Sequence, residues 1–333
     1  MVIFAISILF LSGTLAIANY LDELDQSQTV MTENTFLAIG QVPIPENPIY
    51  IQIAQSFIPT KDILTRVELY IGKNATTTYP YIVAIRDNLT NDDLTTVSVA
   101  AEQVPSEDFG WVEFDFDDIS VTTGMTYFIV CYTNNITDNW YAIGANNISD
   151  SYPYGCAWIS YDDGDSWSNE SHETSPYPVT TNNYQGGQPK NGRGGNWDIC
   201  FKTYGRTNGQ PSQADISGPP NGKPGVNYDF ILTATDPDED DIRFYVIWGD
   251  GDTEWTSLGA SGTPVTVSHS WGTKGSYTIT VKAQDEFGLD GPENTLDITI
   301  PRTKAVNRPL LRLFENYQFI LQFITKILIK FGL

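Results

Sequence analysis

The chain has 333 residues and a formal net charge of -23, from 18 basic and 41 acidic side chains. Hydrophobic residues make up 41% of it and aromatic residues 13%, so the composition allows two domains with real cores and excludes a disordered chain. A nucleic-acid-binding protein needs clustered lysine and arginine to neutralise phosphates, and an acidic body repels them. Nucleic acid is therefore excluded as a partner.

The first 18 residues have the pattern of a secretory signal peptide. An apolar run over residues 2–11 is followed by Ala16 and Ala18, which are small residues three and one positions before a cleavage site after Ala18. We therefore expect residues 1–18 to be removed and the protein to be secreted or held at the cell surface. A buried N-terminal strand or an uncleaved membrane helix is the alternative. The mature end is expected to be exposed and acidic, with Asp22, Glu23 and Asp25.

Five Asn-x-Ser/Thr sequons agree with export and predict a glycoprotein, because this tripeptide is the acceptor of N-linked glycans in secreted proteins. All of them precede residue 206. They are Asn74, Asn88, Asn135, Asn147 and Asn169.

The three cysteines are Cys131, Cys156 and Cys200, and none belongs to a C-x-x-C pair. A zinc or redox site of that kind is therefore not expected. In an oxidising compartment two of them would form one disulfide and leave one thiol. The alternative is three buried side chains that act as small apolar residues.

Residues 19–206 contain short runs in which apolar and polar residues alternate. In Val112–Phe116 the alternation is strict, which puts one face of a strand in a core and the other in water. Nine such runs without a convincing long helix predict an antiparallel β-sandwich. The runs are Ile51–Phe57, Leu64–Ile71, Tyr79–Ile85, Thr95–Ala101, Trp111–Phe116, Thr126–Tyr132, Trp140–Ile143, Gly155–Ser160 and Trp197–Tyr204.

Four stretches of this segment resemble the jelly-roll modules of secreted archaeal and bacterial proteins. They are QSFIPTKDILTRVELYIG from Gln55, WVEFDFDDISVTTGMTYFIV from Trp111, GCAWISYDDGDSW from Gly155 and WDICFKTYG from Trp197. The resemblance implies a jelly-roll-like domain over residues 19–206. It also implies a surface-binding role of the kind that carbohydrate-binding-like modules have, although one such fold serves many functions.

Residues 160–167 (SYDDGDSW) fit the Asp-box pattern S-x-D-x-G-x-S/T-W. The Asp162 carboxylate is suited to accept backbone N–H bonds, Gly164 allows positive φ, and Trp167 is placed to fold over the turn. Asp-boxes recur in sialidases as structural turns away from the catalytic centre. We therefore expect Ser160, Asp162, Gly164 and Trp167 to form a structural turn.

Aromatic side chains in this domain form a candidate ligand-binding platform, because aromatic faces stack on the apolar faces of sugars. Packing in the core is the alternative for each of them. Trp111 and Trp158 lie within predicted strands, so we expect these two to pack inside. The candidates for ligand binding are Trp140, Tyr152, Tyr154 and Trp167.

Residues 207–225 are rich in Gly, Pro, Ser and Asn, which predicts a linker that enters the first strand of a second domain. Residues 211–301 resemble the polycystic kidney disease (PKD) domain, a β-sandwich of immunoglobulin type. The resemblance rests on an ordered set of motifs: strands at 228–235 and 244–248, then WGDGD at 248–252, VSHSW at 267–271 and GSYTITVKAQD at 275–285.

Each motif of the second domain also has a physical reason. Gly249, Asp250 and Gly251 predict a tight turn in which Asp250 bonds local backbone. His269 is expected to hold a turn rather than to act as a base. The side chains expected in one core are Trp248, Trp271, Tyr277, Ile279 and Val281.

An acidic turn in the second domain predicts calcium as a cofactor. Asp236, Asp238 and Asp240 lie in a Pro-containing turn, and Asp285 ends a later strand. Hard oxygen ligands at this density suit Ca²⁺, which takes about 6–8 of them. The spacing differs from that of an EF-hand, and the alternative is a solvated acidic turn.

Residues 302–333 carry six basic residues and one acidic residue. Their apolar residues recur at helical spacing, which predicts a basic amphipathic helix that contacts a membrane or the cell envelope. The segment resembles tails that follow PKD-like domains in uncultured archaeal surface proteins, which implies sorting or anchoring. Docking on the protein itself or pairing between copies is the alternative. The apolar stripe is Leu310, Leu313, Phe314, Tyr317, Leu321, Ile324, Leu328 and Phe331.

Together these features predict an all-β chain with two tandem β-sandwich domains. Only His172 and His269 are present as histidines, and no G-x-S-x-G, H-E-x-x-H or P-loop motif occurs, so we expect no enzyme. The expected function is adhesion or binding of a glycan or protein outside the cell, with the second domain as spacer. A structural envelope component without a separate ligand is one alternative. A glycoside hydrolase or its accessory module, built on two carboxylates, is the other.

Overall fold

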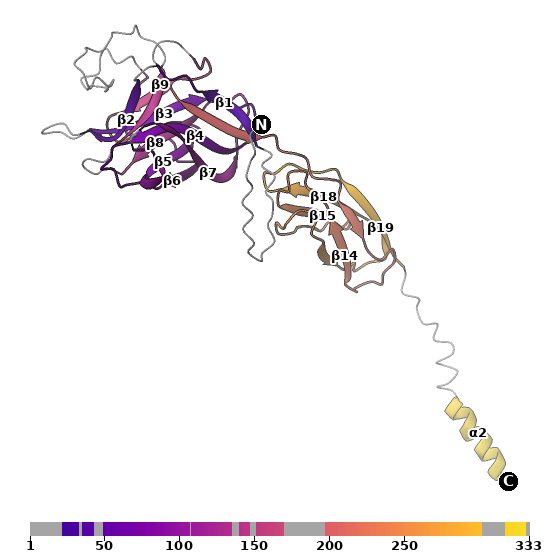
Figure 1. The fold of residues 1–333 in the computed structure, drawn as a ribbon. Helices are drawn as coiled ribbons and strands as arrows, with labels where there is room; N and C mark the ends of the chain where they lie inside the picture. Colours follow the sequence, from indigo (N-terminus) through magenta and orange to yellow (C-terminus); the bar gives the residue numbers. More distant parts are fainter. Residues whose placement is uncertain are drawn as a thin grey trace, which may run out of the picture. The chain divides into compact units, whose positions relative to one another are not determined.

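The computed structural model describes residues 22–32, 35–42, 49–106, 108–134, 140–146, 151–169, 197–301 and 317–330. The chain divides into two compact units, Met1–Asn208 (unit 1) and Gly209–Leu333 (unit 2). Strands make up about half of the described residues and form all of the sheets, while the only α-helix among those residues is at 317–330, so the fold is all-β as predicted (Figure 1). The expected signal peptide, 1–18, and residues 302–316 of the expected tail lie outside the described residues.

Unit 1 is built from twelve strands in its described part. They are β1 (Glu23–Gln28), β2 (Phe36–Val42), β3 (Ile49–Phe57), β4 (Ile63–Lys73), β5 (Tyr81–Arg86), β6 (Thr95–Val99), β7 (Gly110–Ser120), β8 (Tyr127–Thr133), β9 (Trp140–Asn146), β10 (Ala157–Ser160), β11 (Asp198–Ile199) and β12 (Phe201–Arg206). Each of the nine predicted runs coincides with strand structure, and β1 and β2 are two strands that the sequence pattern did not reveal.

The strands of unit 1 are hydrogen-bonded in the order β1-β12-β4-β9-β2-β3-β8-β5-β6, with β7 on β4, β10 on β3 and β11 on β9. Strand β3 pairs with β2 through residues 49–51 and with β8 through residues 53–57. It therefore joins one half of the sandwich, which runs from β1 to β2 in this order, to the other half, which contains β8, β5 and β6. Side chains from both halves meet in one apolar core, which makes unit 1 a β-sandwich. The strict alternation predicted in β7 holds, since Val112 and Phe114 are buried and Glu113 and Asp115 are exposed.

Strand β1 corrects the expectation of an exposed acidic segment for Asp22, whereas Glu23 is exposed as expected. The strand pairs along β12, and the side chain of Asp22 just before it is only 4% exposed. Arg66 of β4 donates to the Asp22 carboxylate at 2.8 Å and also pairs with Glu68 and Glu113. Its guanidinium lies 3.5 Å from the centre of the Tyr204 ring. The buried ion pair holds an acidic segment on the sheet that sequence polarity alone assigned to solvent.

Unit 2 has two facing sheets of immunoglobulin type. The strands are β13 (Asp215–Ser217), β14 (Tyr228–Thr233), β15 (Ile242–Ile247), β16 (Thr253–Trp255), β17 (Val265–His269), β18 (Gly275–Asp285) and β19 (Asn294–Ile300). One sheet has the order β13-β14-β17 and the other β16-β15-β18-β19. Trp248, Trp271, Ile279 and Val281 are buried in the core as predicted, and Tyr277 packs against them at its edge.

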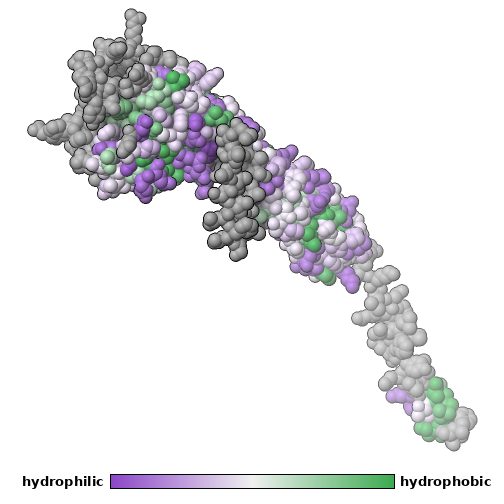
Figure 2. All heavy atoms as spheres, viewed as in Figure 1, coloured by the Kyte–Doolittle hydropathy of each residue, from purple (hydrophilic) through white to green (hydrophobic). Residues whose placement is uncertain are grey.

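Helix α2 (Tyr317–Lys330) lies within the predicted C-terminal helix. Phe323, Ile324, Ile327 and Leu328 recur at helical spacing and are exposed. Figure 2 shows hydrophobic atoms along one side of this helix and hydrophilic atoms along another. Within the described part of the chain, no helix combines the length and apolarity needed to cross a bilayer.

Replacing Arg66 by methionine is expected to lower the free energy of unfolding of unit 1 by about 3 kcal/mol, because the Asp22 carboxylate is then buried without its partner. Urea denaturation measures this cost. Lys61→Met is the matched control: Lys61 pairs with Glu23, whose side chain is 72% exposed, and such exposed pairs contribute about 0–1 kcal/mol. Equal costs for the two variants would contradict the role given to Arg66.

Candidate functional site

Three carboxylates from two segments of unit 2 meet in its interior. Asp236 and Asp240 lie in the connection between β14 and β15, and Asp285 is the last residue of β18. Strand pairing sets Asp285 directly opposite Ile242, two residues after Asp240. One oxygen from each carboxylate lies within 4.8 Å of the others. The residues are 5%, 6% and 1% exposed, respectively, so the group is inside the protein rather than on a solvated turn. We call Asp236, Asp240 and Asp285 the acidic trio.

The turn that carries Asp236 is organised around this side chain. The Asp236 Oδ1 atom accepts the backbone N–H of Asp238 at 2.9 Å and that of Asp240 at 3.4 Å. The backbone N–H of Asp236 donates to Ser261 Oγ at 2.8 Å, and Glu239 takes a positive φ of 65°. These bonds hold the loop closed and leave the second oxygen, Oδ2, buried with no hydrogen-bond partner.

The electrostatics of the acidic trio call for a cation or a proton. Burial raises the pKa of Asp236, and the charges of Asp238 and Asp285 add to this, although the two backbone N–H groups oppose it. Like charges this close in a weakly polar interior repel strongly. A buried polar oxygen without a partner costs about 1–3 kcal/mol. A divalent cation bound by oxygen ligands would relieve both costs, so the residues present fit Ca²⁺.

Asp285 is also held in place by its surroundings. Its Oδ1 atom accepts the backbone N–H of Leu289 at 2.8 Å, which orients the carboxylate at the end of β18. The three side chains supply at most six oxygens, and two of these already accept backbone N–H bonds. A bound Ca²⁺ would therefore need further oxygens from backbone carbonyls or water.

The structure brings together three of the four acids predicted as calcium ligands. Asp238 falls outside the group and accepts the backbone N–H of Gly209 instead. Glu239, between Asp238 and Asp240, has a positive φ of 65°, and residue spacing alone could not reveal this turn.

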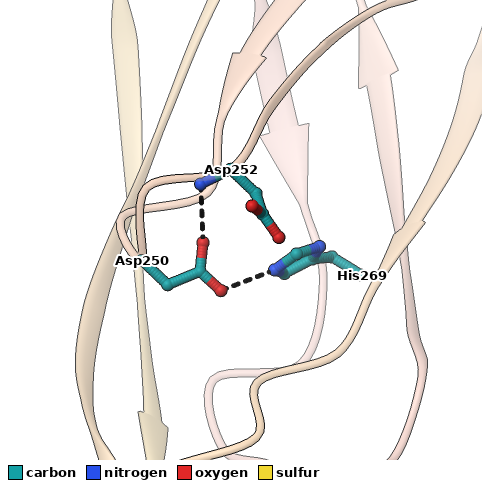
Figure 3. Close-up of side chains that lie close together, drawn as sticks. All are labelled: Asp250, Asp252 and His269. Atoms are coloured by element: carbon teal, nitrogen blue, oxygen red, sulfur yellow. Dashed lines mark hydrogen bonds and ion pairs between the residues drawn. The ribbon is translucent and has the colours of Figure 1, made fainter.

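A second group of possible metal ligands consists of Asp250, Asp252 and His269 (Figure 3). His269 Nε2 lies 2.9 Å from Asp250 Oδ2, and the imidazole stacks on Trp248 with the ring centres 4.6 Å apart. Asp250 Oδ1 accepts the backbone N–H of Asp252 at 3.2 Å. These contacts join the β15–β16 turn to the end of β17, as expected for a structural aspartate and a turn-holding histidine.

Glycine is required in that turn. Gly249 has φ 80° and Gly251 has φ 109°, and a Cβ atom on Gly249 would lie 2.6 Å from the carbonyl oxygen of Thr278. Burial alone would raise the pKa of Asp250. The hydrogen bond with His269 and the Asp252 N–H outweigh burial and hold that pKa below its ordinary value.

The aromatic candidates in unit 1 do not form one platform. Tyr152 is buried against Phe201, and its hydroxyl donates to Gln26 Oε1 at 3.0 Å, so it is a core residue. Trp167 packs on a small cluster and donates from its ring nitrogen to the Gly164 carbonyl at 3.0 Å. Tyr154 is 63% exposed, and Trp140 lines a separate pocket at β9.

The two tryptophans expected inside behave differently from each other. Trp158 is partly buried against the cluster that contains Trp167. Trp111 is 37% exposed on the outer face of β7, where the ammonium of Lys202 lies 4.0 Å from its ring centre. The expectation for Trp111 was wrong because its strand alternates, and Val112, not Trp111, faces the core.

The Asp-box forms the expected turn. Asp162 Oδ1 accepts the hydroxyl of Ser160 at 2.7 Å and the backbone N–H of Ser166 at 2.9 Å. Gly164 has φ 94° and donates its N–H to Ser160 Oγ. With Trp167 folded over it, this turn has a structural role in unit 1.

The predicted modification sites lie on the surface where they are described. Asn88 and Asn169 are exposed, and Asn74 lies in the turn after β4, where its amide donates to Thr76. Asn135 and Asn147 lie outside the described residues. All three cysteines are free thiols; Cys131 and Cys200 are buried, and burial raises the pKa of each to about 12.

The fold and these sites define a tandem of two β-sandwich units, of which the second is immunoglobulin-like and encloses a group of carboxylates. No protein-family model and no curated protein matches the chain. Among solved structures, a PKD domain of an M14-like peptidase from a Thermoplasmatales archaeon is 39% identical to it, covers 29% of this chain and 100% of that domain, and has a TM-score of 0.28.

Two further solved structures are similar to parts of the chain at low identity. The CARDB domain of a Pyrococcus furiosus protein, solved in complex with di-metal ions, is 12% identical, with coverage of 28% of this chain and 90% of that one and a TM-score of 0.23. A β-1,2-glucanase from Parabacteroides distasonis is 8% identical, with coverage of 85% and 37% and a TM-score of 0.20.

The bond between Asp250 and His269 predicts an acid-dependent loss of stability. Because the folded-state pKa of Asp250 is depressed, its contribution is full above the ordinary aspartate pKa of about 3.9 and disappears as the pH falls through the lower folded value. Asp250→Asn is expected to cost about 1 kcal/mol at pH 7 and to flatten the loss of stability as the pH falls below about 4. Denaturant titrations at several pH values measure this. Asp252→Asn is the control and should keep the wild-type slope.

Proposed function

We propose that this protein works outside the cell as a calcium-stabilised, non-enzymatic interaction protein. In this proposal unit 1 binds a glycan or a protein, and unit 2 is a PKD-type module that spaces unit 1 from the cell. The observation that carries the proposal is the acidic trio with its unpartnered Asp236 oxygen. The signal-peptide pattern and the sequons support the same compartment.

Calcium connects the buried carboxylates to the extracellular location. Extracellular modules bind Ca²⁺ with dissociation constants of about 10⁻⁴–10⁻³ M, a range suited to the higher calcium levels outside cells. A cation that binds only the folded state stabilises it by mass action. A secreted unit 2 would then be rigid outside the cell, which suits a spacer.

Binding rather than catalysis agrees with the chemistry of the described residues. Of the two histidines, His269 is engaged by Asp250 and stacked on Trp248, and His172 lies outside the described residues. The carboxylates of the acidic trio are buried, where a substrate would not reach them. A β-sandwich that presents loops and an outer sheet face is suited to recognition.

Helix α2 supports contact with a membrane or the envelope. Its exposed apolar side chains include Phe323, Ile324 and Ile327, while Lys326 and Lys330 supply positive charge. A basic amphipathic helix lies in the interface of an anionic membrane and buries its apolar face there. This contact would hold an otherwise acidic protein at the cell surface.

Calcium is expected to raise the melting temperature of unit 2 in the mature chain. At one hundred times its dissociation constant the gain is about 2.7 kcal/mol, which corresponds to about 10–20 °C for a domain of this size. Calorimetry with and without Ca²⁺, after chelation, measures both heat and melting temperature. Two variants, Asp236→Asn and Asp285→Asn, should remove the rise in melting temperature, because each substitution removes one negative charge from the proposed Ca²⁺ ligands.

Asp238→Asn is the matched control, since it removes an acid from the same turn but outside the acidic trio. It should keep the calcium response. A wild-type protein that shows neither binding heat nor a higher melting temperature with Ca²⁺ would refute the calcium part of the proposal. Ordered calcium-dependent self-assembly without any ligand binding would instead favour a structural envelope component.

A further inference from the structure

A pocket of about 350 Å³ opens on the outer face of the sheet in unit 1, where β4, β9 and β2 run side by side. Strand pairing sets Gly72 opposite Ala142, and these two small residues form its floor. Their neighbours Ile71, Tyr141 and Ile143 are fully buried on the other face. Because side chains alternate along a strand, the small residues face outward and leave room above the sheet.

Aromatic rings form the walls of this pocket. The rings of Tyr70 and Phe109 stack with their centres 5.7 Å apart and an interplanar angle of 29°. The ring centre of Phe36 lies 5.9 Å from that of Phe109. Trp140 lines the same pocket from β9. The segment before β7 crosses close above the floor, since a Cβ atom on Gly72 would lie 3.1 Å from the Asp108 carbonyl oxygen. Rings from separate elements thus converge on one hollow.

Polar groups complete the lining. Lys73, Ser106 and Asp108 also line the pocket, and the carboxylate of Asp108 accepts the backbone N–H of Phe109 at 2.8 Å. Within the described residues, the Lys73 ammonium has one hydrogen bond, to the Thr77 carbonyl oxygen at 3.2 Å, and no ion pair. Pockets of about 300–1,000 Å³ with apolar walls and a few polar groups are the usual form of small-ligand sites.

We propose that this pocket binds one neutral pyranose residue of a glycan. The C–H groups on one face of such a sugar are attracted to the negative face of an aromatic ring, which Tyr70, Phe109 and Trp140 provide. Its hydroxyls both donate and accept hydrogen bonds, and Lys73, Ser106 and Asp108 offer both kinds of partner. The inference deepens the proposed function, since it names the ligand class of unit 1 and rests on that unit being a binding module.

A neutral sugar fits the charges better than an acidic one. The pocket carries one cation and one carboxylate, and the whole chain has a net charge of -23, which repels anions at long range. An apolar ligand fits less well, because it would take water away from the charges of Lys73 and Asp108 without offering them new hydrogen bonds.

The test is binding of the full mature chain to an immobilised array of neutral hexopyranose oligosaccharides, alongside sialylated and uronate-containing ones. The wild-type protein should bind neutral members. Trp140→Ala should weaken this binding at least tenfold, because it removes a stacking wall. Ala142→Leu should abolish it without removing any binding group, since the larger side chain fills the floor. Tyr70→Phe, the mildest change, should weaken it less than either.

Tyr154→Ala is the matched control, because Tyr154 is an exposed aromatic residue of the same unit outside the pocket. It should bind as the wild type does. Sugar binding that survives both Trp140→Ala and Ala142→Leu would overturn the pocket assignment and leave the proposed function standing. Binding of acidic members only, or of no sugar at all, would overturn the ligand class, and the calcium response of unit 2 would be unaffected by that result.

Discussion

Burial of negative charge is the constraint around which unit 2 is organised. The loop between its sheets folds back so that two backbone N–H groups bond one oxygen of Asp236, while the other oxygen stays inside without a partner. Three carboxylates within 4.8 Å are unfavourable in a weakly polar interior unless positive charge joins them. The same arrangement that destabilises the empty domain would stabilise a calcium-bound one, so the proposed cation would link folding to the calcium level around the protein.

The two units manage charge in different ways. Unit 1 balances its acids internally: Arg66 bonds Asp22, and Lys202 together with Tyr204 holds Glu68. Burial alone would raise the pKa of Glu68, but these bonds outweigh burial and keep that pKa below its ordinary value. Under the proposed function, unit 2 would instead leave the charge of its acidic trio to an external cation. In the proposed function, unit 1 would hold a fixed binding surface and unit 2 would respond to the cation concentration around it.

The two units also differ in where their aromatic side chains lie. Small residues on the outer face of β4 and β9 open a pocket in unit 1, and an added side chain there would close it. In unit 2 the aromatic side chains Trp248 and Trp271 fill the core and support His269 instead. Aromatic residues thus line a pocket in one sandwich and fill a packed interior in the other. Residue type alone does not distinguish these roles.

Periodicity in the sequence was enough to place most strands, the two-sandwich organisation and the C-terminal helix, and local motifs placed both turns built on glycine, because these depend on neighbours a few residues apart. The acidic turn and the strand end at Asp285 also predicted the acids of the trio. The tertiary structure decided the rest. It alone showed that Arg66 bonds the acidic segment at β1, and that Tyr152 is buried while Trp111 is not. It also showed that Asp238 lies outside the trio, and that one pocket is lined by Tyr70, Phe109 and Trp140. Each of these depends on residues distant in the chain meeting across strands, and no local pattern records which strands become neighbours.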